Sequence, residues 1–181
     1  VDASHSIDDR EYALQLAGIA AAIRDPGVLA AIRAGATGRI GIALATWGEP
    51  RQPKDATPWH LVHDAASAER FARRVEDHRR RVGGGTGIGH AVLFCIDLFK
   101  GNGLAGKRRV IDISGDGSET APRDWNVTPG QARQAAVARG IPVNGLVLLS
   151  DEADLDAYYE AHVIGGAGAF GNRPRLSPSR R

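Results

Sequence analysis

The feature that most constrains the fold is an alternation of short apolar runs with amphipathic segments of helical period. Apolar runs at 39–47, 109–114 and 142–149 are typical of strands, and apolar residues recur every three or four positions between them. Strands that alternate with helices favour an open, mainly parallel sheet with right-handed crossovers and helices on both faces. We therefore predict a three-layer, doubly wound α/β fold, with a short antiparallel edge strand over residues 59–63.

Helices are predicted between these strands from their apolar spacing and from the residues at their ends. The predicted helices cover residues 8–24, 28–32, 67–81, 88–99, 128–139 and 151–163. Ser67 is placed to cap the helix at 67–81, and Arg79 to Arg81 are predicted to lie on its solvated face. Thr128 followed by Pro129 is typical of a helix start.

Chain length and charge indicate one domain that does not bind nucleic acid through its folded body. A chain of 181 residues is long enough to bury a sizeable core. Four arginines and no acid lie in the last ten residues, so the rest of the chain is mildly acidic despite a net charge of +2. We predict a domain over residues 1–171 and a basic, disordered tail over residues 172–181.

The cysteine count, the length of the apolar runs and the first residue bear on the compartment and the processing of the chain. Cys95 is the single cysteine, so no internal disulfide forms, and its apolar helical position predicts a core residue rather than a nucleophile. No apolar run reaches the roughly 20 residues that a membrane-spanning helix needs. The chain begins at Val1 and contains no methionine, so we expect that its natural start, including part of the first strand, is missing.

Oxygen-bearing side chains gather in three loops that are predicted to meet. The first loop is Asp2-Ala3-Ser4-His5-Ser6, the second is the glycine-rich segment 83–87 with Thr86, and the third is 114–117 with Asp116. Asp2 and Asp116 both follow predicted strands, and in open α/β sheets the loops at the carboxyl ends of strands form the binding crevice. We expect the three loops to lie together.

Two carboxylates and three hydroxyls form a set of hard oxygen ligands. Such a set suits Mg²⁺, Ca²⁺ or Mn²⁺ and disfavours zinc or copper. The predicted metal ligands are Asp2, Ser4, Ser6, Thr86 and Asp116. With two negative charges and only neutral hydroxyls from the protein, the ion would remain under-shielded on its outer side. It would therefore attract one more carboxylate, brought by a protein partner.

This pattern resembles a known family. Asp2-x-Ser4-x-Ser6, a lone Thr86 in a glycine-rich loop and Asp116-Gly117 after an apolar strand are similar to the metal-ion-dependent adhesion site of von Willebrand factor type A (VWA) domains. Segments 109–117 and 157–166 look closer to an uncharacterised bacterial branch of these domains. The resemblance implies that the serines and the threonine touch the metal and that both aspartates bind it directly or through water. It also implies a bacterial envelope protein, periplasmic or secreted, with a cytoplasmic location as the alternative. We expect a binding module rather than an enzyme.

Departures from the family pattern keep alternatives open. His5 stands where the family usually has glycine, and Pro174 and Pro178 argue against the expected final strand and helix after Phe170. Ser4 and Ser6 could instead cap the first helix, and Asp116-Gly117 could be an ordinary turn. A metal-dependent hydrolase of phosphate esters would use the same ligands but needs a general base or a second cation nearby, and only His5 and Asp112 are candidates for the base. A truncated domain without retained activity is the third possibility.

Overall fold

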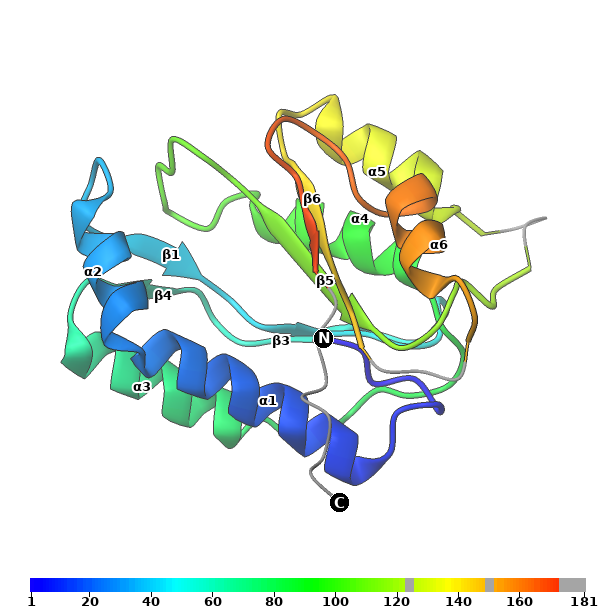
Figure 1. Ribbon diagram of the computed structural model, residues 1–181, viewed down its shortest axis with the longest axis horizontal. Helices are drawn as coiled ribbons and strands as arrows, with labels where there is room; N and C mark the ends of the chain where they lie inside the picture. The colour runs from blue at the N-terminus through cyan, green and yellow to red at the C-terminus, as the bar shows by residue number, and fades with distance from the viewer. Residues whose placement is uncertain (123–125, 149–151, 173–181) are drawn as a thin grey trace, which may run out of the picture.

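Helices and strands alternate along most of the chain in this computed structural model, which describes residues 1–122, 126–148 and 152–172 (Figure 1). The described helices are α1 (Asp9–Arg24), α2 (Pro26–Ala34), α3 (Ala65–Glu76), α4 (Ile88–Leu98), α5 (Pro129–Val137) and α6 (Leu155–His162). The described strands are β1 (Ile40–Ile42), β2 (Ala45–Thr46), β3 (Asp55–Ala56), β4 (His60–Val62), β5 (Ile111–Gly115), β6 (Val143–Val147) and β7 (Gly171–Asn172). The fold is mixed α/β with small sheets, some of them parallel.

The parallel sheet has the order β5-β6-β7. β5 pairs with β6 in a register that sets Ile111 opposite Val143 and Gly115 opposite Val147. β6 is nearly continuous in burial, as the apolar run predicted for a buried parallel strand. β7 is a correction, because a strand was not expected after Phe170. It forms because the Gly145 N–H donates to the Phe170 carbonyl at 3.1 Å and the pairing continues to Gly171.

The predicted strand at 39–47 is wrong as a single element, because the structure divides it into β1 and β2. β1 pairs antiparallel with β4, as predicted for the edge strand, whereas β2 pairs antiparallel with β3, which lies where no strand was predicted. Between the two strands, the Leu44 N–H donates to Thr57 Oγ1 at 3.0 Å, and the Thr57 N–H donates to the Leu44 carbonyl at 2.9 Å. A side-chain hydroxyl thus replaces one regular ladder bond, which interrupts the strand.

The start of the chain lies beside β2 and β5. Asp2 forms an isolated parallel bridge with Trp47, and the Ala3 N–H donates to the Trp47 carbonyl at 2.8 Å. The Asp2 N–H donates to the Ser114 carbonyl at 3.2 Å. This extended segment therefore joins the end of β2 to β5, and the residues that follow it emerge at the carboxyl end of β5.

Helix caps correct two of the sequence predictions. Asp8 caps α1 in a capping box with Glu11, so the alternative in which Ser4 and Ser6 cap this helix is wrong. Asp64 caps α3 through a 2.7 Å bond from the Ser67 N–H, so Ser67 lies in the first turn rather than at the cap. Thr128 caps α5 as predicted.

The end of α3 also differs from the prediction. α3 ends at Glu76, so Arg79, Arg80 and Arg81 do not extend a helical face. They belong instead to a segment without helix or strand that leads toward the glycine-rich loop. Of the three, Arg80 contacts the first loop, where its guanidinium donates to the Ala3 and Ser4 carbonyls.

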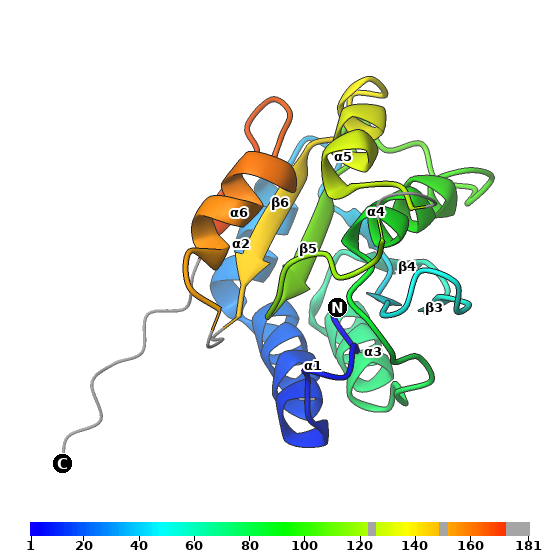
Figure 2. The same ribbon diagram turned by 90° about the vertical axis from the view of Figure 1, so that its right-hand side faces the viewer.

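Two hydrophobic clusters stabilise the fold. One is formed chiefly by α1, α2 and α3 with residues of the first strands, and the other by α4, α5 and α6 with β5 and β6. Figures 1 and 2 show α1 beside α3, with α4, α5 and α6 on the other side of the strands. Arg24 of α1 donates to Glu69 and Glu76 of α3, which ties this helix pair on its outer side.

The length and apolar character of a helix decide whether it can span a membrane, and the described helices fall short in one or both. None is long and apolar enough to cross a membrane by itself, and α1 with α2 reaches that length only as a pair bent by 58°. The predicted tail at 172–181 falls from residue 173 onward outside the described residues, as do Pro174 and Pro178.

Close packing of α4 against the start of α5 gives a stability prediction. A Cβ on Gly89 would lie 1.9 Å from the Val127 carbonyl oxygen, whereas a Cβ on Gly18 of α1 would meet nothing within 4 Å. Gly89→Ala should therefore lower the free energy of unfolding by about 1–3 kcal/mol through overpacking. Gly18→Ala, the matched control, should raise it by up to about 1 kcal/mol. Denaturant unfolding measures both, and equal stability of the two variants would contradict this packing.

Candidate functional site

Backbone hydrogen bonds bring the three oxygen-bearing loops to one place. The Asp2 N–H donates to the Ser114 carbonyl, which joins the first loop to the end of β5. The His5 N–H donates to the Gly84 carbonyl at 2.8 Å, which joins the first loop to the glycine-rich loop. The Thr120 N–H donates to the Thr86 carbonyl at 3.0 Å, which joins the glycine-rich loop to the segment after Asp116. The loops therefore meet at the carboxyl end of β5, where the sequence predicted them.

Side chains from the first and third loops contact one another directly. Ser6 Oγ donates to Asp116 Oδ1 at 2.8 Å, although 110 positions separate the two residues. Ser4 Oγ and Ser6 Oγ lie 3.0 Å apart, and the Ser4 N–H donates to Asp2 Oδ1 at 2.8 Å. These contacts form a continuous polar chain from the buried carboxylate of Asp2 to the half-buried carboxylate of Asp116.

Thr86 borders the same group. Its N–H donates to Thr120 Oγ1 at 2.8 Å, which fixes the glycine-rich loop. A Cβ on Gly117 would lie 4.0 Å from Thr86 Oγ1, so the hydroxyl is next to the residue that follows Asp116. The five predicted ligand residues thus lie in three loops that contact one another.

Burial changes steeply across the group. Asp2 is 0% exposed, Ser4 is 1% exposed and Thr86 is 5% exposed, whereas Ser6 lies at the surface. His5 is exposed as well, with its ring beside Gly83, so the imidazole that replaces the family's glycine does not fill the centre of the group. The group therefore has a buried inner side, the floor, at Asp2, Ser4 and Thr86, and it is open to solvent at Ser6.

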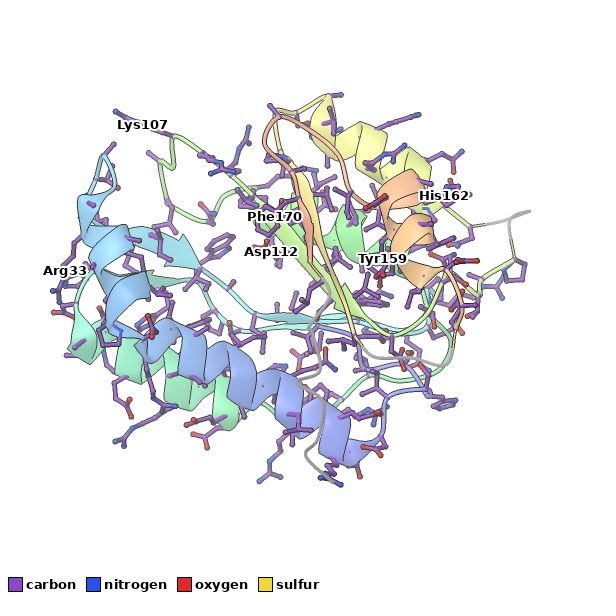
Figure 3. The ribbon with its side chains drawn as sticks, viewed as in Figure 1. Arg33, Lys107, Asp112, Tyr159, His162 and Phe170 are labelled. Atoms are coloured by element: carbon purple, nitrogen blue, oxygen red, sulfur yellow. The ribbon has the colours of Figure 1, made fainter. Side chains whose placement is uncertain are left out.

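Two buried oxygens at the floor have no hydrogen-bond partner among the described residues. They are Asp2 Oδ2 and the Tyr159 hydroxyl, which α6 extends toward the strands (Figure 3). A Cβ on Gly115 would lie 2.5 Å from the hydroxyl and 2.9 Å from Asp2 Oδ2, so glycine is required here to let both oxygens approach β5. Burial raises the pKa of Asp2 to about 6, and the nearby Asp116 carboxylate also raises it.

These residues fit a hard divalent cation by their chemistry. A buried carboxylate oxygen without a donor is costly unless it is protonated or meets a positive charge. The described residues contain no cluster of three or more His, Cys, Asp or Glu side chains that could hold a metal. A cation at this place would therefore depend on the hydroxyls of Ser4, Ser6 and Thr86 in addition to the two aspartates, as Mg²⁺ and Ca²⁺ sites permit.

Arg80 is a supporting residue that the sequence analysis placed elsewhere. Its Nη2 donates to the carbonyls of Ala3 at 3.0 Å and Ser4 at 2.7 Å, and its Nη1 donates to Asp9 at 3.2 Å. The guanidinium also lies 5.9 Å from the centre of the Tyr12 ring. Through these two carbonyls it holds the backbone of the first loop in place. No local signal identifies this role, because it depends on where α3 ends.

Three glutamates that the sequence analysis did not select support the other loops. Glu49 accepts from the Gly85 N–H at 3.3 Å, and Glu119 accepts from the Gly89 N–H at 3.0 Å. Glu152 accepts from the Ser118 N–H at 2.8 Å. Their carboxylates therefore occupy backbone donors of the glycine-rich and Asp116 loops. Each partner is at least 30 positions away in sequence, so spacing could not reveal them.

Other candidates lie outside the group. Asp112 accepts from Asn144 Nδ2 at 2.7 Å within the parallel sheet (Figure 3). Cys95 packs against the second hydrophobic cluster, and burial raises the pKa of its thiol to about 11. A thiol of this kind is a poor nucleophile, in agreement with its predicted place in the core.

Comparison with known proteins places the chain in a family. The model of a family described as "Protein of unknown function (DUF1194)" matches residues 1–173. The sequence has no match among curated proteins.

Solved structures show a related fold. Proximal thread matrix protein 1 (PTMP1) from the mussel byssus aligns with 95% of this chain at a TM-score of 0.58 and 14% identity, and this chain spans 39% of its length. Another crystal structure of PTMP1 aligns with 81% of this chain at a TM-score of 0.52 and 17% identity, over 35% of its own length. PTMP1 has a VWA-like fold, so the likeness indicates that fold for this chain.

The buried carboxyl of Asp2 gives a pH prediction for the metal-free protein. Its pKa is about 6 in the folded state and 3.8 in the reference state, so between these values the unfolded chain loses a proton that the folded chain keeps. The free energy of unfolding therefore falls as pH rises through this window, by about 3 kcal/mol in total. Asp2→Asn removes this contribution.

Denaturant unfolding with a chelator present, followed from about pH 4 to about pH 7, measures the effect as the difference between wild type and variant. Asp97→Asn, in an exposed side chain of α4, controls for loss of a carboxylate elsewhere. If the free energy of unfolding of the wild type changed with pH in parallel with that of Asp2→Asn, the raised pKa of the buried Asp2 carboxyl would be contradicted.

Proposed function

Since the chain belongs to the DUF1194 family of proteins of unknown function, we propose its function from its own geometry. We propose that it is a divalent-metal-dependent protein-binding module of the adhesion type. The observation that carries the proposal is the contact of Ser6 with Asp116 at 2.8 Å, which joins the third loop to the first loop, where one buried oxygen of Asp2 has no partner among the described residues. Separate loops converge there on one group of oxygens, which is the arrangement that a hard cation requires.

The proposed ligands are Asp2, Ser4, Ser6, Thr86 and Asp116, with Mg²⁺ as the ion, or Ca²⁺ or Mn²⁺ in its place. When bound, the ion supplies a positive charge that attracts a carboxylate from outside. Asp2 compensates that charge from the buried floor, and Ser4 and Ser6 present neutral hydroxyls. Arg80 keeps the first loop in place through the Ala3 and Ser4 carbonyls.

The proposed partner is a protein that presents an acidic side chain. Asp2 and Asp116 are the only carboxylates among the proposed ligands, so a divalent ion would be balanced in charge but incompletely coordinated on its open side. Ser6 and His5 are exposed there, which leaves room for a residue of another molecule. A carboxylate is the ligand that hard cations prefer for the remaining position.

The same proposal extends the fold to a three-layer, doubly wound arrangement of the VWA type. Its support is the separation of the two hydrophobic clusters, one with α1 to α3 and the other with α4 to α6. The parallel bridge between Asp2 and Trp47 and the bond from Asp2 to Ser114 support a first strand that lies between β2 and β5.

The module is proposed to act without catalysis. Its structural neighbour is a thread matrix protein, and its family has no described activity, which is consistent with a non-enzymatic module. The hydrolase alternative would need a general base, and its candidates were His5 and Asp112. Asp112 is engaged by Asn144 in the sheet, and His5 points from an exposed loop. A periplasmic or secreted location is also part of the proposal, supported by the byssal origin of that neighbour.

Metal binding predicts a rise in thermal stability. A ligand that binds only the folded state stabilises it by about 2.7 kcal/mol when its concentration is about 100-fold above Kd. Mg²⁺ should therefore raise the Tm of the wild type, and EDTA should reverse the rise. Asp116→Asn and Ser6→Ala should abolish it, whereas the control Asp97→Asn should respond as the wild type does.

The carboxylate step is tested in the same experiment with acetate as the probe. Because two ligands that bind cooperatively must stabilise one another, acetate should raise the Tm further in Mg²⁺ and have no effect in EDTA. An unchanged Tm in Mg²⁺ would contradict the metal site itself. A Tm that rises in Mg²⁺ but does not respond to acetate would contradict the proposed acidic partner alone.

A further inference from the structure

A concave region lies between the C-terminal half of α3 and the segment around β3. Its volume is about 550 Å³, which falls within the range of ligand-binding pockets, about 300–1,000 Å³. The residues that line it are Asp55, Ala56, Thr57, Pro58, Arg70, Arg73, Arg74, Asp77, His78, Arg79 and Arg81. None of them is among the five proposed metal ligands, so this region is a separate candidate.

Arginine dominates this arginine-lined hollow. Five arginines and two aspartates line it, which leaves an excess of three positive charges. Arg70, Arg73 and Arg74 come from one face of α3. Arg79 and Arg81 come from the segment that follows this helix and has no helix or strand. All five side chains are exposed to solvent, so their guanidinium groups are accessible.

Carboxylates within the protein neutralise only part of this charge. Arg73 Nε lies 2.7 Å from Glu69, and Arg81 Nε lies 3.8 Å from Asp55. Among the described residues, Arg70, Arg74 and Arg79 form no ion pair within 4 Å. Like charges that converge on a concave surface repel one another and create a positive potential that concentrates anions.

A solvated helix end does not account for the whole group. Cations in the last turn of a helix are favoured by its dipole, which explains Arg73 and Arg74. Arg70 lies a turn earlier, and Arg79 and Arg81 lie beyond the end of α3. Helix stabilisation therefore gives no reason for these three to face the same hollow.

The segment after α3 divides its arginines between two places. Arg79 and Arg81 line the hollow, whereas Arg80 between them donates to the Ala3 and Ser4 carbonyls of the first loop. The hollow therefore receives two positive charges from this segment in addition to the three from α3.

We propose that the arginine-lined hollow binds an anion that carries two or more phosphate groups. The planar guanidinium matches the geometry of phosphate oxygens and binds them through paired hydrogen bonds. Five arginine side chains line a volume of about 550 Å³, which is large enough for several phosphate groups. The source of the phosphate groups, a free polyphosphate or the headgroups of a lipid surface, follows from the two arms of the test.

The first arm measures binding of tripolyphosphate by isothermal titration calorimetry, with EDTA present so that the metal site does not contribute. The second arm measures flotation of the full chain with vesicles of phosphatidylglycerol in phosphatidylcholine. Arg70→Gln/Arg74→Gln should weaken binding about tenfold or more, because two charge-assisted donors are lost. Arg33→Gln/Arg39→Gln, which removes two exposed arginines near the end of α2, should change it less than about twofold.

Each outcome decides the proposal. Loss in the hollow variant but not in the control supports it, and the arm in which binding is found identifies the source as free polyphosphate or lipid headgroup. Equal loss in both variants would show attraction by diffuse surface charge and would overturn it. Absence of binding by the wild type in both arms, at low ionic strength where screening is weakest, would also overturn it.

Discussion

The buried carboxylate of Asp2 is the constraint on which the rest of the candidate site depends. One of its oxygens accepts the Ser4 N–H, and the other has no donor among the described residues. A carboxylate in this environment favours protonation or a nearby cation, which is why its pKa rises to about 6. Gly115 leaves room for this oxygen beside β5, and the hydroxyl of Tyr159 closes the other side. The fold thus preserves an unsatisfied acceptor where three loops meet.

The surrounding loops are held mainly by backbone contacts. Bonds from Asp2 to Ser114 and from His5 to Gly84 place the hydroxyls without using them, so Ser4 and Ser6 keep acceptor capacity for a ligand. Arg80 strengthens the same loop through its carbonyls, while its sequence neighbours line the arginine-lined hollow. The segment 79–81 therefore contributes to both candidate sites, with Arg80 at the first loop and Arg79 and Arg81 at the hollow.

The sequence predicted the parts of the fold and site that depend on local patterns. The apolar run at 142–149 became β6, the cap at Thr128 was placed correctly, and the three loops meet as the strand order implied. Distant contacts decided the rest. Thr57 interrupts the strand at Leu44 from 13 positions away, and Asp64 rather than Ser67 caps α3. Arg80 was assigned to a helix because nothing local marks Glu76 as the last helical residue.

The central claim is that one hard cation occupies the space between Asp2, Ser4, Ser6, Thr86 and Asp116. A crystal structure of the full chain grown with Mn²⁺, with anomalous scattering recorded at the manganese edge, tests it most directly. The account predicts a single strong anomalous peak within coordination distance, about 2.0–2.3 Å, of the serine hydroxyls or their bridging waters. Manganese bound elsewhere, or these five side chains free of it at saturating concentration, would contradict the account.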